Sequence, residues 1–182
     1  LTEEELEIIG RLATKYDVIV MEDLAYVGMD FRTNFGEPFK EPFVPTVAKY
    51  TDNYMLLVSA SKIFSYAGQR IAMVCFSPVV ANRESEHLNN YFGMPTFLRA
   101  FVFGVLYALS SGTAHSAQHA YATMLGAAAD GRLNFVDGCR EYERRGGRTK
   151  SIFTDNGFHV VYEKDGDQPI SDGLKYKECV NL

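Results

Sequence analysis

The order of apolar and polar residues at the start of the chain predicts a helix followed by a buried strand. The apolar positions within residues 2–16 recur with a 3.6-residue period, and they are Leu6, Ile9, Leu12 and Ala13. Thr2 is a suitable N-cap, and the glutamates that follow it suit the positive end of a helix dipole. Residues 17–23 place consecutive apolar residues ahead of two acids, which is typical of a short strand buried on both faces in a parallel sheet. A helix followed by such a strand indicates an α/β fold.

The same patterns predict the elements that follow. Apolar runs predict strands at 54–58 and 70–76, which flank a short polar segment. Helices are expected from 78 to about 90 and over 96–110, 115–129 and 137–155, and a further strand over 158–162. Residues 28–46 are rich in glycine, proline, phenylalanine and charge, so we expect a long loop there, of the kind that often serves function.

Composition narrows the classes of protein that fit. The chain has 182 residues, 47% of them hydrophobic, which suits one domain, or one domain with part of another, around a substantial core. A net charge of −5 without a cluster of lysines and arginines makes nucleic acid and acidic membrane surfaces poor partners. No apolar run reaches the roughly 18 residues that a membrane-spanning helix needs, so none is predicted.

Cysteines and histidines predict neither a disulfide framework nor a metal centre. Cys75, Cys139 and Cys179 lie far apart and are odd in number, so we expect reduced thiols in a reducing cytosol. His115 and His119 have the i, i+4 spacing of two helical metal ligands, but no nearby acid completes the set. We therefore expect no metal site.

Candidate chemistry lies between the predicted strands at 54–58 and 70–76. Lys62 follows the first of them, and a lysine that is partly desolvated there has a lowered pKa and a more nucleophilic amine. The hydroxyls of Ser59 and Ser61 and the guanidinium of Arg70 are groups that bind a phosphate dianion. Together these residues suggest an imine between Lys62 and an aldehyde that carries a phosphate. The simpler interpretation is a surface lysine in a loop with two serines as turn residues, because short motifs also match by chance.

A second candidate is the segment that begins with Asp23, at the carboxyl end of the first predicted strand. A carboxylate buried there needs a partner, and a cationic ligand would provide one. Tyr26, three residues later, could reach the same ligand through its phenol. The simpler interpretations are an aspartate that caps a loop by accepting backbone hydrogen bonds and an ordinary loop aromatic.

Taken jointly, these segments resemble the class I/II aminotransferases, which are the fold type I pyridoxal 5′-phosphate enzymes. The matching positions are Asp23, Tyr26, Ser59, Ser61, Lys62 and Arg70. The resemblance implies that the aspartate binds the pyridine nitrogen of the cofactor and that the tyrosine hydrogen-bonds its phenolic oxygen. It implies that Lys62 forms the internal aldimine, a Schiff base with the cofactor, and acts as the catalytic base. By the resemblance Ser59 and Arg70 would hold the phosphate, and Ser61 stays a cofactor-binding candidate because of its hydroxyl.

The resemblance also implies an architecture. The expected fold is α/β, with a mixed, mostly parallel sheet and helices on both faces. Residues 1–156 would be part of the large cofactor-binding domain, and residues 157–182 would begin the small C-terminal domain. The implied protein is a cytoplasmic homodimer. Because the resembled enzymes are longer, we expect this chain to be a piece of a longer protein that turns over poorly alone.

Three functions fit these residues. The first is transamination between an α-amino acid and a 2-oxo acid, both small-molecule partners. The second is β-elimination on the same scaffold, since the residues named above serve the cofactor and do not fix the reaction. The third is a non-catalytic, aminotransferase-like sensing domain of a transcription regulator.

Overall fold

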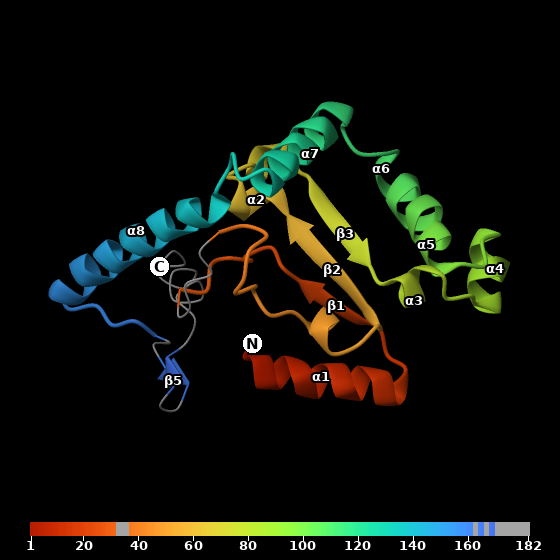
Figure 1. Cartoon of the computed structure of the whole chain (residues 1–182), viewed down its shortest axis with the longest axis horizontal. Coiled ribbons are helices and arrows are strands. Elements are labelled where there is room, and N and C mark those ends of the chain that lie inside the picture. The colour runs from red at the N-terminus through yellow and green to blue at the C-terminus, as the bar shows by residue number, and fades with distance from the viewer. Residues whose placement is uncertain (32–36, 162–163, 166–167, 170–182) are drawn as a thin grey trace. The chain divides into compact units, whose positions relative to one another are not determined.

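A computed structural model describes residues 1–31, 37–161, 164–165 and 168–169. It divides into two compact units. Unit 1 consists of Leu1–Ala25, Pro45–Ser61 and Tyr66–Ala122. Unit 2 consists of Tyr26–Val44, Lys62–Ser65 and the described part of Thr123–Leu182. Helices and strands carry the labels of Figure 1.

The centre of unit 1 is a sheet of three strands in the order β1-β2-β3 (Figure 1). The strands are β1 (Val20–Asp23), β2 (Tyr54–Ser59) and β3 (Ala72–Phe76). β1 and β2 pair in parallel and β2 and β3 pair antiparallel, so the expectation of a mixed sheet is confirmed. The expectation of a mostly parallel sheet is wrong for the described strands. The reason lies between β2 and β3, where α2 (Ala60–Ile63) and η2 (Ala67–Gln69) are too short to return the chain along the sheet as a crossover helix does.

Strand β1 is shorter and less buried than its sequence suggests. It begins at Val20, and its residues alternate between half-buried and exposed, with Met21 63% exposed. The expectation of a strand over 17–23 buried on both faces is therefore wrong. Asp17 instead ends the preceding helix in a left-handed conformation, and β1 lies at the edge of the three-stranded sheet, where one side of a strand has no neighbouring strand to cover it.

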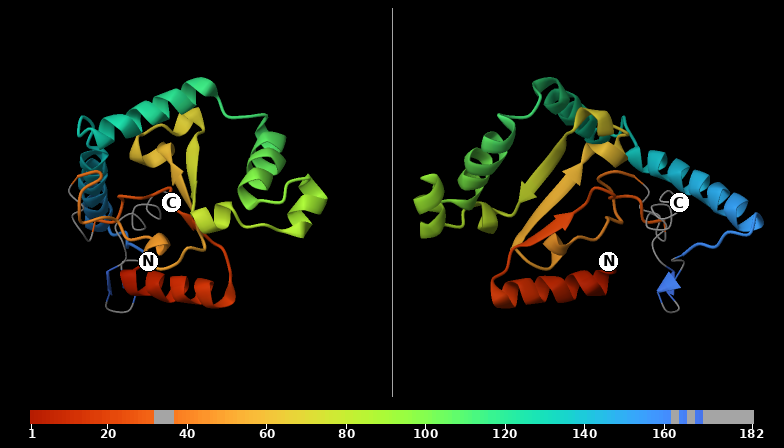
Figure 2. Two further views of the ribbon diagram at one scale, coloured as in Figure 1. Left: turned by 45° about the vertical axis from the view of Figure 1, so that its right-hand side comes forward. Right: turned by 180° about the vertical axis from the view of Figure 1, so that it is seen from behind.

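Helix α1 (Glu3–Tyr16) confirms the prediction for the start of the chain. Thr2 is the N-cap, and its side chain accepts from the amide of Glu5 while the Glu5 side chain accepts from the amide of Thr2. This reciprocal pair is a capping box, which satisfies two amides that the helix itself cannot bond. The views in Figure 2 show α1 (red) alongside the segment that contains η1 (Val47–Lys49).

The packing of α1 on this segment depends on a glycine. Gly10 is buried, and a Cβ atom added there would lie 2.5 Å from the Cβ of Tyr50 and 3.1 Å from its backbone carbonyl carbon. Since these are not the flexible ends of a side chain, the backbone would have to shift. The close approach of α1 to the segment before β2 therefore requires glycine at this position.

Gly10→Ala is expected to lower the free energy of unfolding by about 1–3 kcal/mol, the usual cost of overpacking a core. Urea denaturation measures it. The matched control is Gly126→Ala in α7 (His115–Ala129), where an added Cβ meets nothing within 4 Å. This control is expected to be neutral or to gain up to about 1 kcal/mol from helix propensity. Equal shifts for the two variants would contradict the packing described here.

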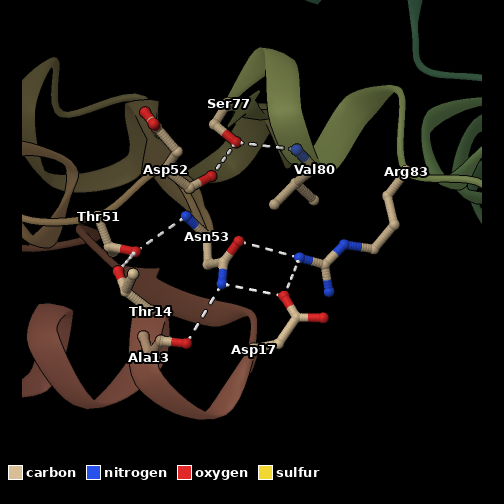
Figure 3. Close-up of polar contacts among 9 residues, drawn as sticks. All are labelled: Ala13, Thr14, Asp17, Thr51, Asp52, Asn53, Ser77, Val80 and Arg83. Carbon is tan, nitrogen blue, oxygen red and sulfur yellow. Dashed lines mark hydrogen bonds and ion pairs between the residues drawn. The ribbon is translucent and has the colours of Figure 1, made fainter.

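A polar network holds the end of α1 to the start of β2 (Figure 3). The buried Asn53 donates from its side-chain amide to the carbonyl of Ala13 at 3.2 Å and to the carboxylate of Asp17 at 3.3 Å. It accepts from Arg83 at 2.9 Å, and Arg83 also forms an ion pair with Asp17 at 2.7 Å. The network lies at the start of β2, which is the opposite end of that strand from Ser59. It therefore fixes that end of the sheet to α1.

The helices after β3 follow the prediction in part. Ser77 caps α3 (Pro78–Ala81) by accepting from the amide of Val80, but a second helix, α4 (Glu86–Phe92), begins at a new cap, Ser85. The expectation of one helix from 78 to about 90 is therefore wrong. The expected helix over 96–110 is confirmed as a continuous run of α5 (Phe97–Arg99), the π-helical η3 (Ala100–Tyr107) and α6 (Ala108–Ser110).

Helical residues reach the sheet of unit 1 at two points. The Phe76 ring of β3 packs edge-on against Phe97 at 6.0 Å and Phe101 at 5.1 Å between ring centroids. The buried Tyr121 of α7 donates its phenol to the carbonyl of Val58 in β2 at 3.2 Å. The α/β class is thus confirmed, while coverage of both sheet faces by helices stays a prediction.

Unit 2 contains α8 (Phe135–Asp155) and a small antiparallel pair, β4 (Lys164–Asp165) and β5 (Gln168–Pro169). The expected helix over 137–155 is confirmed, and the one over 115–129 is α7, which runs from unit 1 into unit 2. The strand expected over 158–162 is wrong for 158–161, which form no strand, and residue 162 lies outside the described residues. Since most of the chain beyond 161 is also outside them, the domain boundary between 156 and 157 stays a prediction.

Among the described residues, no helix combines the length and the apolar character that crossing a membrane would require. The described thiols agree with the expectation of free cysteines, with Cys75 half-buried and Cys139 buried. Cys179 lies outside the described residues.

Candidate active site

Strand register brings three of the predicted residues to one end of the sheet in unit 1. This is the end at which β1 and β2 finish and β3 begins, and it is called the sheet edge. Asp23 is the last residue of β1 and pairs with Leu57 of the parallel β2, so both strands end at the same edge. Ser59 is the last residue of β2 and pairs with Ala72, the first residue of the antiparallel β3. Arg70 precedes β3 by one residue and therefore lies at this edge as well.

Asp23 caps the loop that follows β1. Its Oδ1 atom accepts from the amide of Ala25 at 2.9 Å, and the residue is exposed. The expectation of a buried acid is therefore wrong, and the alternative of a loop-capping aspartate is confirmed. The two functions are compatible, because an ionised carboxylate accepts several hydrogen bonds through its two oxygens. The neighbouring Glu22 points elsewhere and accepts from the amide of Val47 at 2.8 Å.

Ser59 and Ser61 form a tight turn at the start of α2. The amide of Ser61 donates to the Oγ atom of Ser59 at 3.1 Å, a serine turn that ends the strand. The buried Ala60 between them donates to the carbonyl of Ile71 at 3.3 Å. These bonds fix the backbone immediately ahead of Lys62.

Arg70 adopts a left-handed conformation with φ of 52°, which is uncommon for a residue with a side chain. The residue is exposed, and its Nη1 atom donates to the carbonyl of Ala67 at 3.0 Å. A guanidinium has five N–H donors in a planar fork, so this bond leaves others for an anion at the sheet edge.

The predicted lysine and tyrosine meet in unit 2. The Nζ atom of Lys62 lies 5.5 Å from the centroid of the Tyr26 ring, within the range of a cation–π contact. Both residues are exposed, and Tyr26 is 45% exposed. The expectation of a partly desolvated lysine is therefore wrong for this chain. The sequence indicated apolar strands on either side of Lys62, but the residue lies in a helical turn beyond the end of β2.

Contacts that the sequence did not predict hold the segment after Lys62. The Phe64 ring packs edge-on against Phe135 of α8 at 5.4 Å, and the hydroxyls of Ser65 and Tyr142 lie 3.0 Å apart. Helix α8 is rich in charged residues. Nothing local in the sequence connects it to this segment, because the partners are about 70 residues or more apart in the chain.

Tyr121 was missed in the same way. Its hydrogen bond ends on Val58, the residue directly before Ser59. Burial raises the pKa of the Tyr121 phenol, and the nearby Cys75 thiol raises it further, so the phenol stays protonated and able to donate. Burial also raises the pKa of Cys75. The alanine-rich sequence of α7 gives no sign of a bond to the strand.

Unit 2 also has a pocket of about 410 Å³, lined by residues 37–40 and by residues of 128–134. None of the predicted site residues lines it. Its walls combine apolar residues with the polar side chains of Glu37, Lys40, Asp130 and Asn134.

A comparison with known protein families identifies the family of this protein. The family model described as "Aminotransferase class I and II" matches residues 1–142, which is most of the chain. The protein therefore belongs to the class I and II aminotransferase family, whose members typically depend on pyridoxal phosphate. A search of curated proteins finds no match.

The donor groups present fit pyridoxal phosphate in kind. A carboxylate suits a protonated ring nitrogen, a phenol suits the ring oxygen, and a primary amine suits the aldehyde. Two hydroxyls and a guanidinium suit the phosphate. The carboxylate, the hydroxyls and the guanidinium come from unit 1, and the phenol and the amine come from unit 2.

Proposed function

We propose that the chain is the cofactor-binding part of a pyridoxal-phosphate-dependent aminotransferase, which moves an amino group between an α-amino acid and a 2-oxo acid. The observation that supports this most is the shared sheet edge of Asp23, Ser59 and Arg70. Open α/β sheets bind their ligands outside the carboxyl ends of their strands. Lys62 follows Ser59 by three residues along the chain, within the short helix α2.

Three side chains would hold the phosphate. Ser59 and Ser61 would donate hydroxyl hydrogen bonds, and Arg70 would add charge-assisted bonds from its guanidinium. Such bonds are about twice as strong as neutral ones. Anchoring the phosphate at the sheet edge would keep the bound ring in one position while amino groups are exchanged.

Two side chains would set the properties of the ring. When bound, pyridoxal phosphate supplies an aldehyde that takes up the amino group and a ring that accepts electrons from the substrate. The Asp23 carboxylate would hold a proton on the ring nitrogen by favouring its charged form. Tyr26 would donate its phenol to the ring oxygen.

Lys62 would carry the chemistry of proton transfer. Its amine would hold the cofactor through the aldehyde and would be free of it while substrate is bound. The freed Nζ atom would then accept the proton of the substrate α-carbon as a general base. The Nζ atom lies 5.5 Å from the centroid of the Tyr26 ring, so the two side chains proposed to meet the cofactor are neighbours.

Product analysis tests this function against its alternatives. The whole chain, loaded with pyridoxal phosphate, is mixed with a panel of amino acids, and 2-oxo acid, aminated cofactor and ammonia are quantified. We expect 2-oxo acid and aminated cofactor in equal amounts, faster than with free cofactor and without ammonia. Pyruvate and ammonia from cysteine-like substrates would instead identify a lyase. Cofactor binding without any product above the free-cofactor rate would favour a sensing domain.

We expect this conversion to be close to stoichiometric and the steady-state rate of the chain alone to fall far below the roughly 10 s⁻¹ of a typical enzyme. A typical rate would refute the expectation that the chain turns over poorly alone.

We also propose a homodimer in the cytoplasm. Sedimentation at several protein concentrations tests the dimer.

A further inference from the structure

The exposed face of α7 carries a pair of histidines that the proposed function does not use. His115 and His119 are both exposed, and their Nε2 atoms lie 3.2 Å apart. Their rings are nearly perpendicular, at 87°, with centroids separated by 4.4 Å. The same part of the helix buries Ala117 and Tyr121 completely or almost so. The helix is therefore fixed to unit 1 by one side while the two imidazoles face outward.

The separation of the two nitrogens matches the span of two ligands on one metal ion. Imidazole nitrogens bind zinc at about 2.0–2.1 Å, so two of them in tetrahedral geometry lie about 3.3–3.4 Å apart. In square-planar geometry, adjacent nitrogens lie about 2.9 Å apart at similar bond lengths. The observed 3.2 Å falls between these values, so one ion could bind both rings with little movement.

The sequence alone predicted no metal site here, but with the two nitrogens this close we propose that His115 and His119 form a two-nitrogen chelate for a first-row transition-metal ion of the zinc and copper class. Imidazole favours these ions, whereas magnesium and calcium prefer oxygen ligands. Among the residues that the structure describes, no group of three or more histidine, cysteine, aspartate or glutamate side chains could hold a metal. Water would therefore complete the coordination, and the site would bind reversibly at the surface. Because it links two turns of α7, a bound ion would stabilise the start of this helix.

Calorimetric titration of the whole chain with Zn²⁺ tests this site. We expect one saturable site that weakens about tenfold or more in His115→Ala and in His119→Ala, since a chelate gains affinity from two linked ligands. The double variant His119→Ala/Ala122→His keeps the number of histidines but moves the second one to about 10 Å from the first along the helix. It should lose the site as the single variants do. His87→Ala, which removes a histidine from α4, should bind like the original chain.

Nitrogen-15 NMR of the histidine rings in the original chain provides a second readout that does not depend on any variant folding. Zn²⁺ should shift the Nε2 signals of His115 and His119 together, at one equivalent. The proposal is overturned if the histidine variants bind as the original chain does, if no saturable site is found, or if the two Nε2 signals do not move. In the last case the pair is only a hydrogen bond between two imidazoles.

Discussion

Lys62→Ala is expected to reduce the formation of 2-oxo acid from a bound amino acid by about 10²–10⁴-fold, the usual contribution of a positioned general base. The variant lacks the Nζ atom that would take the proton from the substrate α-carbon, so this proton transfer would be slow. The rate is measured with the chain preloaded with pyridoxal phosphate, by chromatography of the aminated cofactor. The result should hold at saturating cofactor, since the loss concerns proton transfer as well as binding.

The matched control for this variant is Lys15→Ala. Lys15 is also an exposed lysine over a tyrosine ring, with Nζ 5.0 Å from the centroid of Tyr16, but it lies at the end of α1. Its replacement should leave the rate unchanged. If the two variants lose activity equally, or if Lys62→Ala keeps the original rate, the proposed role of Lys62 is wrong.

Asp23→Asn is expected to lower the same rate by about 10–100-fold. An asparagine keeps the shape and can still accept from the amide of Ala25, but it loses the negative charge that would hold a proton on the ring nitrogen. A hydrogen bond to a charged group contributes about 1.5–3 kcal/mol, which corresponds to this range. The measurement is the rate of 2-oxo acid formation, together with a cofactor titration that separates weaker binding from slower reaction.

Asp52→Asn controls for the loss of one acid on the same sheet. Asp52 is exposed and lies just before β2, at the opposite end of the strand from Ser59. The variant should retain full activity and stability. An Asp23→Asn chain that reacts as fast as the original would contradict the role assigned to the carboxylate, even if the lysine result holds.

The sequence predicted those helices and strands that are determined by residues close together in the chain. The capping box of α1 is visible as Thr2 and Glu5, and β2 is visible as an apolar run. The sheet edge could be predicted because Asp23 and Ser59 each follow an apolar run, and strand ends meet once the strands are paired. Arg70 could be placed there too, because it comes just before the apolar run of β3.

Burial and long-range contacts could not be predicted, because they depend on what packs against each residue. Asp23 and Lys62 were both expected to be shielded, yet both are exposed. The alternation of β1 depends on its place at the edge of the sheet, which its own residues do not encode. The contacts between Ser65 and Tyr142 and between Tyr121 and Val58 join segments far apart in sequence, so no spacing rule points to them.

The central claim is that one lysine, three residues after the end of β2 in the sequence, is the residue that binds the cofactor aldehyde. The most direct measurement is incubation of the whole chain with pyridoxal phosphate, reduction with borohydride and mass mapping of the resulting peptides. Reduction converts the bond between aldehyde and amine into a stable secondary amine, so the labelled lysine can be read directly. We predict one label, on Lys62, and none in Lys62→Arg. Equal labelling of Lys62 and the exposed Lys15 would contradict the account.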